Sequence, residues 1–143
     1  MERVKKLELN GRIMHYGIGA VIKKGDKYLL IDRADKPYGF ACITGHIRRD
    51  ENPEDALVRE VKEEVNLEIL SHKLMFERMI NNRECKSGRV LHHCYIFEVG
   101  VKSNTEIEIN DEVKSARWYS IEQIKGLKLE PLWKFFFKKI GVI

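Results

Sequence analysis

The sequence predicts an α/β or α+β sandwich, in which helices cover a central sheet. Three observations lead to this prediction. Strand-like runs occur both before and after a helical segment at residues 53–65, and two further helical segments lie near the end. The 143 residues are 43% hydrophobic and 34% charged, as expected for one globular domain spanning residues 1–143. Such a mixture of elements buries its apolar surface best in layers.

Two β-rich runs open the chain, at residues 15–22 and 27–33. The residues between them include Lys24, Gly25 and Asp26, and a Gly-Asp pair between strands is typical of a hairpin. A third strand is predicted near residues 40–43. The first part of the domain is therefore expected to contribute strands only.

Residues 53–65 have the periodicity of an amphipathic helix. Turning each residue by about 100° about the axis gathers four aliphatic side chains in one sector: Leu57, Val58, Val61 and Val65. A neighbouring sector gathers three acids: Glu60, Glu63 and Glu64. Like charges at this spacing repel each other by roughly a few tenths of a kcal/mol per exposed pair, unless a cation neutralises them. The aliphatic sector is predicted to face the core and the acidic sector to bind a divalent metal.

Both ends of this helix are marked. Asn52 can cap the first turn, and Pro53 suits the first helical position. Asn66 follows the last apolar position, and Asn readily adopts the left-handed conformation that ends a helix. These residues predict a helix from 53 to 65.

The second half of the chain returns to strands and ends in helices. Long strands are predicted at residues 68–81 and 89–101, flanking a polar turn at 82–88, with another strand at 116–119. Helices are predicted at 121–124 and 132–140, the latter after Glu130 and Pro131. The three consecutive phenylalanines at 135–137 are interpreted as core residues of that last helix rather than an interface.

Composition excludes several classes of protein. No apolar run reaches the 18 or so residues of a membrane span, and the first residues lack an apolar signal segment, so a cytoplasmic protein without a membrane partner is expected. The net charge of +4 comes from scattered residues, which disfavours nucleic acid as the main partner. Cys42, Cys85 and Cys94 are odd in number and lack a paired spacing, so they are expected to be reduced thiols.

The segment from Gly45 to Leu67 resembles the signature of the Nudix hydrolases. That signature reads Gly, five residues, Glu, seven residues, Arg-Glu, an apolar residue, any residue, Glu-Glu, any residue, Gly and an apolar residue. The matching residues are Gly45, Glu51, Arg59, Glu60, Val61, Glu63, Glu64 and Leu67. Asn66 replaces the last Gly of the signature. The resemblance implies an α/β/α sandwich with a central mixed β-sheet.

Departures from the family pattern lie just before the helix. Ile43 and Thr44 replace a usual Pro-Gly pair, Arg48 stands where an acid is common, and Asp50 replaces a frequent Gly. In the family the backbone carbonyl at the Thr44 position often ligates the metal, and Thr can supply a carbonyl as well as Gly can.

A further acid is implied downstream. In some Nudix proteins a glutamate six residues before a Trp in a late strand is a metal ligand or the general base, and Glu112 has this position relative to Trp118. Glu106 and Glu108 are nearby alternatives.

Clustered carboxylates favour Mg²⁺, a hard cation that binds oxygen and shares its coordination shell with phosphates, with Mn²⁺ as the alternative ion. The expected metal ligands are Glu60, Glu63, Glu64, the Thr44 carbonyl and Glu112. The expected catalytic residues are Glu60, Glu63, Glu112 and Arg59, with Glu112 as the first candidate for the base and Arg59 orienting the glutamates. Glu51 is expected to support the site or bind a further metal.

Substrate contacts are predicted at four residues. Tyr38 and Phe40 can flank a nucleotide base, and Gly45 and His46 lie where a phosphate would bind. His46, His72, His92 and His93 do not have the spacing of metal ligands on a helix and are interpreted as surface or core residues. The family resemblance makes a homodimer the alternative to a monomer.

The predicted function is Mg²⁺-dependent hydrolysis of the pyrophosphate linkage in a nucleoside diphosphate joined to another group. One alternative is a pyrophosphohydrolase that removes modified nucleoside triphosphates. Another alternative is a non-catalytic Nudix-fold module that binds nucleotides and has a regulatory role. It is suggested by Ile43, Thr44 and Asp50. Retention of all the helix glutamates favours an enzyme.

Overall fold

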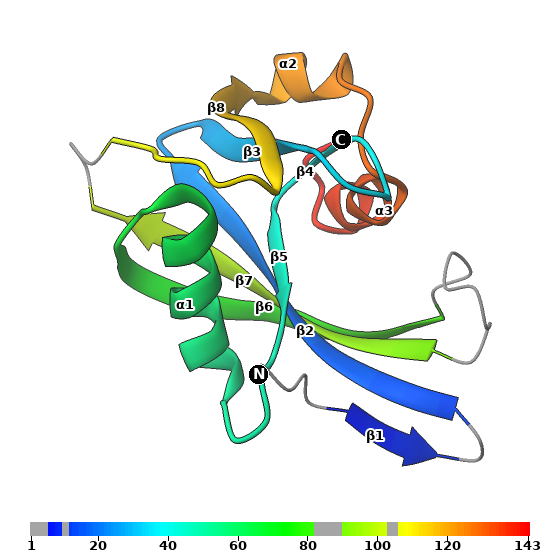
Figure 1. Ribbon diagram of the computed structural model, residues 1–143. Coiled ribbons are helices and arrows are strands. Elements are labelled where there is room, and N and C mark those ends of the chain that lie inside the picture. The colour runs from blue at the N-terminus through cyan, green and yellow to red at the C-terminus, as the bar shows by residue number, and fades with distance from the viewer. Residues whose placement is uncertain (1–5, 10–11, 82–89, 103–105) are drawn as a thin grey trace.

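A mixed sheet forms the centre of the molecule. The computed structural model describes residues 6–9, 12–81, 90–102 and 106–143. Within them, eight strands form a sheet with the order β4-β3-β2-β7-β6, while β1 and β5 pair with β2, and β8 pairs with β3 (Figure 1). The strands are β1 (Lys6–Leu9), β2 (Arg12–Lys24), β3 (Lys27–Arg33), β4 (Phe40–Ala41), β5 (Ile43–His46), β6 (Ile69–Asn81), β7 (Val90–Val101) and β8 (Val113–Ser120).

The described residues also form three helices, which are α1 (Pro53–Val65), α2 (Ile121–Lys125) and α3 (Pro131–Lys139). The paired strands are antiparallel, except that β2 and β7 run parallel. The sheet is therefore mixed, as predicted.

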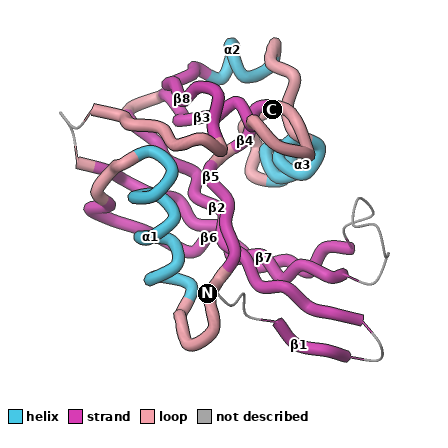
Figure 2. The backbone as a smooth tube through the Cα atoms, in the orientation of Figure 1, coloured by secondary structure: helices cyan, strands magenta, loops and turns pink. Residues whose placement is uncertain are grey.

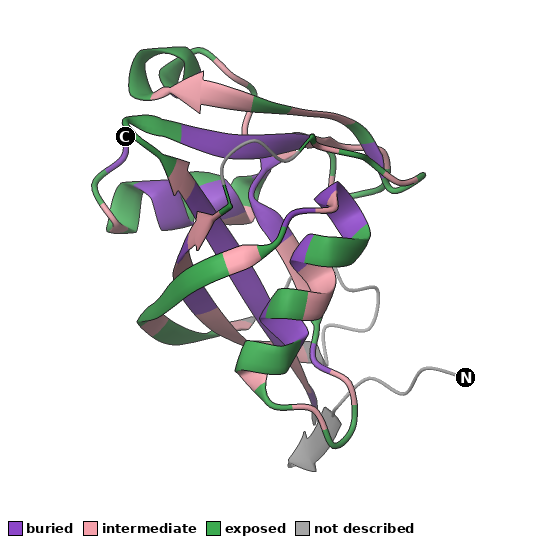
Figure 3. Cartoon of the chain, turned by 90° about the vertical axis from the view of Figure 1, so that its left-hand side faces the viewer, coloured by how far each residue is buried: buried purple, intermediate pink, exposed green. Residues whose placement is uncertain are grey.

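Two apolar clusters cover the two faces of this sheet. One cluster joins Leu57, Val61 and Val65 of α1 to one face, and the other joins Trp133, Phe136 and Phe137 of α3 to the opposite face. Figure 2 shows the two helices on either side of the strands, and Figure 3 shows buried segments of the strands between them. The expected sandwich of helices around a central mixed sheet is confirmed.

The first predicted strand is longer than expected, whereas the second has the predicted bounds. The hairpin turn lies at Gly25 and Asp26, as expected, and β2 begins three residues before and ends two residues after the predicted run, while β3 spans residues 27–33 as predicted. The third predicted strand is two short strands, because Cys42 separates β4 from β5. The sequence prediction missed β1, whose four residues pair with the start of β2. After β5, a short loop leads the chain to α1.

The ends of α1 agree with the prediction to the residue. Asn52 accepts a hydrogen bond from the Asp55 amide at 2.8 Å, which satisfies one of the free amides of the first turn. Asn66 ends the helix in the left-handed conformation, with φ of 59°, and its amide donates to the Lys62 carbonyl. Asp50 also has a positive φ of 66°, in the position where the family often has Gly. Both polar residues adopt a conformation that glycine adopts more easily.

The core face of α1 differs from the prediction at one residue. Val58 was expected in the core but is 48% exposed, whereas Ala56 and Glu64 are buried with Leu57, Val61 and Val65. The buried arc is rotated toward the glutamates, because α1 packs against β5 and the loop after it as well as against β2. Val58 lies just beyond the opposite edge of that arc.

The C-terminal elements confirm the prediction with small shifts in their bounds. Ser120 and Gln123 form a reciprocal cap at the start of α2, and the Glu130 side chain caps α3. Phe136 and Phe137 are fully buried, while Phe135 is 42% exposed beneath the guanidinium of Arg78. The aromatic run is thus mainly a core element.

Some predictions lie outside the described residues, namely the polar turn at 82–88 and Cys85 within it. Cys42 and Cys94 are free thiols, buried and partly buried respectively. None of the three helices formed by the described residues has the length and apolar character needed to cross a membrane.

Candidate active site

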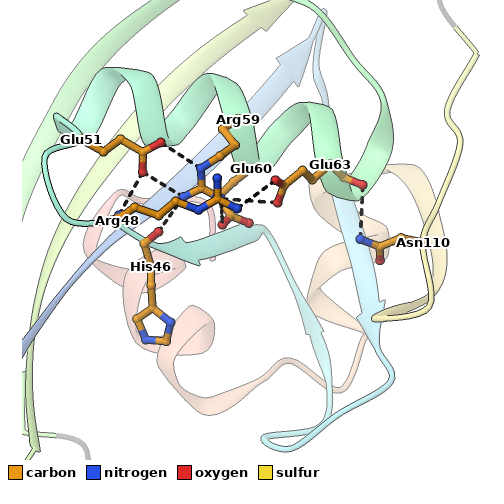
Figure 4. Close-up of polar contacts among 7 residues, drawn as sticks. All are labelled: His46, Arg48, Glu51, Arg59, Glu60, Glu63 and Asn110. Carbon is orange, nitrogen blue, oxygen red and sulfur yellow. Dashed lines mark hydrogen bonds and ion pairs between the residues drawn. The ribbon is translucent and has the colours of Figure 1, made fainter. Parts of the chain in front are cut away.

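Arg59 is the centre of the hydrogen-bonded network at the candidate active site. Its Nε lies 2.8 Å from Glu51 Oε2, and its Nη2 lies 2.9 Å from Glu51 Oε1. The same guanidinium donates to the His46 carbonyl at 2.9 Å and to Glu60 Oε1 at 2.7 Å (Figure 4). Its contact with Glu63 Oε2 is longer, at 3.4 Å. Arg59 therefore fixes the loop before α1 and one of the acids at the same time.

The loop before α1 is also closed by Glu51. Its carboxylate accepts from the Arg48 amide at 3.0 Å in addition to the two bonds from Arg59. These hydrogen bonds, chiefly those from Arg59, lower the pKa of Glu51 from its usual range despite partial burial. A carboxylate with this many donors is an anchor for the loop, which agrees with the supporting role expected for Glu51.

Gly45 is required by the close approach of Glu60. A Cβ atom at position 45 would overlap the Glu60 carboxyl group. Burial raises the pKa of Glu60, assisted by the charges of Glu63 and Glu112, although the bond from Arg59 opposes the change. The first glycine of the motif thus leaves the space that one of its glutamates occupies.

Glu64 is the most unusual of the three helix glutamates. It is only 4% exposed, and its Oε2 is buried with no hydrogen-bond partner among the described residues. Burial, followed by the charges of Glu60 and Glu112, raises its pKa to about 8. A buried carboxylate oxygen without a donor is costly unless a proton or a cation binds it. The arrangement therefore fits a divalent metal bound by oxygen ligands.

Glu112 reaches the same group of acids from the segment before β8. Its charge raises the pKa of both Glu60 and Glu64, so the three carboxyl groups share one electrostatic environment. Asn110 fixes this segment by donating to the Glu63 carbonyl at 3.2 Å and accepting from the Glu112 amide at 3.0 Å. Sequence spacing alone left three candidates for the downstream acid, which were Glu112, Glu106 and Glu108. The fold brings Glu112 to the glutamates of α1.

The two other downstream acids lie elsewhere. Glu108 accepts a hydrogen bond from Asn66 at the end of α1, and Glu106 is exposed. Neither of them lines the cavity beside the glutamates.

A cavity of about 990 Å³ adjoins the acids and continues across to α3. Its acidic end is lined by Thr44, Glu60, Glu63, Glu64 and Glu112. Five cationic side chains also line it, which are Arg33, Lys36, Arg48, Arg59 and Arg78. Trp133 and Phe136 contribute apolar surface at the α3 end. Such a cavity can accept an anionic ligand with an apolar or aromatic part.

The four predicted substrate contacts are divided by the structure. Gly45 and His46 line the cavity. Tyr38 is 54% exposed beneath Lys114, and Phe40 packs edge-on against Tyr119, so neither aromatic ring is among the residues that line the cavity. The predicted roles of these two residues in binding a base stay predictions.

Sequence reasoning missed Asn110, His92 and three of the cationic lining residues, which are Arg33, Lys36 and Arg78. Asn110 carried no signal beyond its position two residues before Glu112. His92 was interpreted as a surface or core residue, but it lines the cavity and lies near His15 and His46. Burial, then the charges of its two neighbours, lowers the pKa of His92 to about 4, and burial similarly lowers the pKa of His46.

Comparison with known proteins agrees with this geometry. The model of the NUDIX domain family matches residues 14–139. The ADP-ribose pyrophosphatase of Methanocaldococcus jannaschii is 28% identical over 115 residues, which are 79% of this chain and 66% of that protein. The chain thus spans just under two thirds of the length of this curated relative.

Solved structures share the fold. The MutT protein from Methanosarcina mazei Go1 superposes with a TM-score of 0.75 at 18% identity, covering 94% of this chain and 96% of that one. The NUDIX domain of Shewanella oneidensis NrtR, solved in complex with ADP ribose, has a TM-score of 0.70 at 18% identity. The match covers 88% of this chain and 85% of that one. Identities this low show the fold alone.

Nudix hydrolases act on phosphoric anhydrides and generally use divalent metals. The expected membership of the Nudix family is confirmed. The family match covers most of the chain, including the helix glutamates, Arg59 and Glu112. This chain belongs to the NUDIX domain family.

Proposed function

We propose that this protein is a Mg²⁺-dependent hydrolase that cleaves the pyrophosphate linkage of a nucleoside diphosphate joined to another group. One observation carries the proposal. Among the described residues, Glu64 Oε2 is buried without a hydrogen-bond partner, and burial together with the charges of Glu60 and Glu112 raises the pKa of Glu64. A hard divalent cation compensates such a cluster and binds phosphate oxygens with its remaining coordination positions.

The proposed ligands are the carboxylates of Glu60, Glu63, Glu64 and Glu112 with the Thr44 carbonyl, all from residues that line one end of the cavity. When bound, Mg²⁺ would neutralise phosphate charge and lower the pKa of a coordinated water. Mn²⁺ accepts the same oxygen ligands and is the alternative ion.

In the proposed reaction, the oxygen of a water molecule forms a bond to phosphorus while the bridging P–O bond breaks. Glu112 is the first candidate to accept the proton of that water, and Glu63, which is half exposed, is the second. Two phosphorylated fragments result. Arg59 acts as a positioning residue, because it binds Glu51, Glu60 and the His46 carbonyl.

The form of the cavity supports a diphosphate substrate with groups on both sides. Cationic residues line it next to the acids, where they can bind the phosphate that the metal does not. The apolar α3 end, with Trp133 and Phe136, can receive a base or sugar. The similarity to an ADP-ribose pyrophosphatase supports this substrate class.

A substrate screen tests the proposal. The full chain should be assayed with Mg²⁺ against nucleoside diphosphate sugars, dinucleotides and nucleoside triphosphates, with both products identified by chromatography. We expect turnover of the diphosphate compounds to two monophosphates, and loss of turnover when the metal is chelated. Reaction in water labelled with oxygen-18 would identify the phosphorus that is attacked.

A matched pair of variants connects the activity to the proposed ligands. Glu64→Gln removes the carboxylate charge and should lower kcat by at least about a hundredfold, because catalytic stabilisation by a bound metal is worth several kcal/mol. Glu54→Gln makes the same change in the exposed first turn of α1 and should leave kcat unchanged. Equal activity of the Glu64 variant and the parent would contradict the metal site.

The screen also separates the alternatives. Release of pyrophosphate from triphosphates, without turnover of diphosphate compounds, would indicate a pyrophosphohydrolase for triphosphates. Binding of a nucleotide measured by calorimetry, without turnover of any compound, would indicate a regulatory module, a role suggested by Ile43 and Thr44 before the helix.

A further inference from the structure

Three histidines from three strands meet on the α3 side of the sheet. His15 lies on β2, His46 ends β5, and His92 lies on β7. One ring nitrogen of each lies within 4.8 Å of the others, and the ring centroids are 5.5 to 6.2 Å apart. We propose that His15, His46 and His92 form a binding site for Zn²⁺, distinct from the glutamate site.

Strand register explains why these side chains face one another. His15 pairs with His92 across β2 and β7, and His46 pairs with Gly17 across β2 and β5. Directly opposed residues share a face of a sheet, and so do residues two apart on one strand. His15, Gly17, His46 and His92 are therefore on one face. It is the face that α3 covers, because a Cβ at Gly19, two residues further, would meet the Trp133 ring.

Gly17 lies beside the three histidines on this face. It follows His15 by two residues and pairs with His46 across β2 and β5. Its neighbour across β7 is Cys94, which is only partly buried. The cavity reaches this point, since Gly17, His46, His92 and Cys94 all line it. An ion bound by the imidazoles would thus be accessible from the cavity.

The ligand chemistry selects the ion. Three imidazoles without a carboxylate suit Zn²⁺ and other transition metals, whereas Mg²⁺ requires oxygen ligands. Zn–N bonds of about 2.0–2.1 Å place the nitrogens of a tetrahedral site about 3.4 Å apart, so nitrogens within 4.8 Å of one another must approach by at most about 1.4 Å. Small rotations of the rings supply such a movement. Three protein ligands leave the fourth position open toward the cavity, for water or an oxygen of a ligand.

The proposed zinc ligands are separate from the proposed metal ligands of the hydrolysis. The backbone of His46 faces Arg59 and the acids, whereas its imidazole points away from them (Figure 4). The glutamates are supplied by α1, which packs on the opposite face of the sheet. Zinc binding at the histidines can therefore be tested without reference to turnover.

The test is a zinc titration of the untagged full chain, freed of metal with a chelator and kept in excess Mg²⁺ to occupy the carboxylate site. Calorimetry should show one Zn²⁺ bound per chain. Co²⁺ in place of Zn²⁺ should give the visible absorption of a four-coordinate nitrogen site. Glu63→Gln combined with Glu64→Gln should retain this binding.

Two neighbouring residues of β7 provide a matched comparison. His92→Gln should weaken zinc binding at least tenfold and abolish the Co²⁺ absorption. His93→Gln should change the affinity by less than twofold, because His93 lies on the opposite face between Tyr16 and Tyr95. His46→Gln should repeat the effect of His92→Gln, and its exposed position at the end of β5 makes it the deciding variant if His92→Gln does not fold. Circular dichroism would establish the folding of each variant.

Three results would overturn the proposal. The parent chain could bind no Zn²⁺ in excess Mg²⁺. Binding could be unchanged in His46→Gln and His92→Gln. Binding could instead disappear in the glutamate double variant, which would assign the zinc to the carboxylates.

Discussion

Arg59 donates to both carboxylate oxygens of Glu51, at 2.8 and 2.9 Å, although eight residues separate the two in the chain. This two-point pairing has a fixed geometry that a single bond lacks. Because the same guanidinium contacts Glu60 and the His46 carbonyl, the position of a proposed metal ligand depends on Glu51. Glu51 is thus predicted to affect activity indirectly, through its contact with Arg59.

Glu51→Gln should lower both stability and kcat. Loss of one charged acceptor should reduce the free energy of unfolding by about 1–3 kcal/mol, as measured in urea. The pKa of Glu51 is lower in the folded chain than in the unfolded chain. The ionised carboxylate therefore stabilises the folded chain fully at pH values above its pKa in the unfolded chain. This stabilisation is lost as the pH falls through its pKa in the folded chain. The variant should therefore lose less stability than the parent on acidification. An identical acid profile for both proteins would contradict this role.

Glu64 should make the metal-free protein less stable as the pH rises. Its pKa is raised from 4.5 to about 8 on folding, so the folded chain retains a proton that the unfolded chain releases. The associated stability is complete below pH 4.5 and declines between there and pH 8, by at most about 1.4 kcal/mol per pH unit. Urea unfolding in a chelator should show this decline in the parent and a flatter profile in Glu64→Gln. A steeper profile in the variant would be the opposite of this prediction.

Gly45→Ala should impair the site without disturbing the rest of the fold. The new methyl group would overlap the Glu60 carboxyl group, which must then move from its contact with Arg59. We expect kcat to fall at least tenfold, with a loss of stability of about 1–3 kcal/mol from overpacking. Gly126→Ala is the control, because its Cβ would be 3.6 Å from its nearest neighbour at an ordinary negative φ. Comparable losses in both variants would show that a methyl group at position 45 is no more harmful than one at position 126.

Asn110→Ala should weaken the link between α1 and the segment that carries Glu112. The amide side chain makes one hydrogen bond to each, at 3.2 and 3.0 Å. We expect kcat to decrease about tenfold, which corresponds to a total loss of about 1.4 kcal/mol of transition-state stabilisation, while KM changes little. Steady-state kinetics on the substrate found by the screen would measure both values. A change confined to KM would instead indicate a role for Asn110 in binding substrate.

The best predictions from the sequence concern α1. Its bounds, both caps and the grouping of its glutamates follow from local periodicity and from residues within one turn of each end. Motif spacing also identified Gly45, Glu51 and Arg59. The placement of Val58 was wrong, because the direction of the helix's buried arc depends on which strands it meets and not on its own sequence.

By itself, then, the sequence determined the class of fold, the helix that carries the glutamates of the motif and the family, because these are expressed in short-range spacing. The tertiary structure decided which groups meet. It buried Glu64 Oε2 away from any donor among the described residues, brought Glu112 rather than Glu108 to the acids, and aligned His15, His46 and His92 on one face. These contacts join residues far apart in the chain, and the register of β2 with β5 and β7 and the path of the loop before β8 decide them. No local pattern encodes such a register.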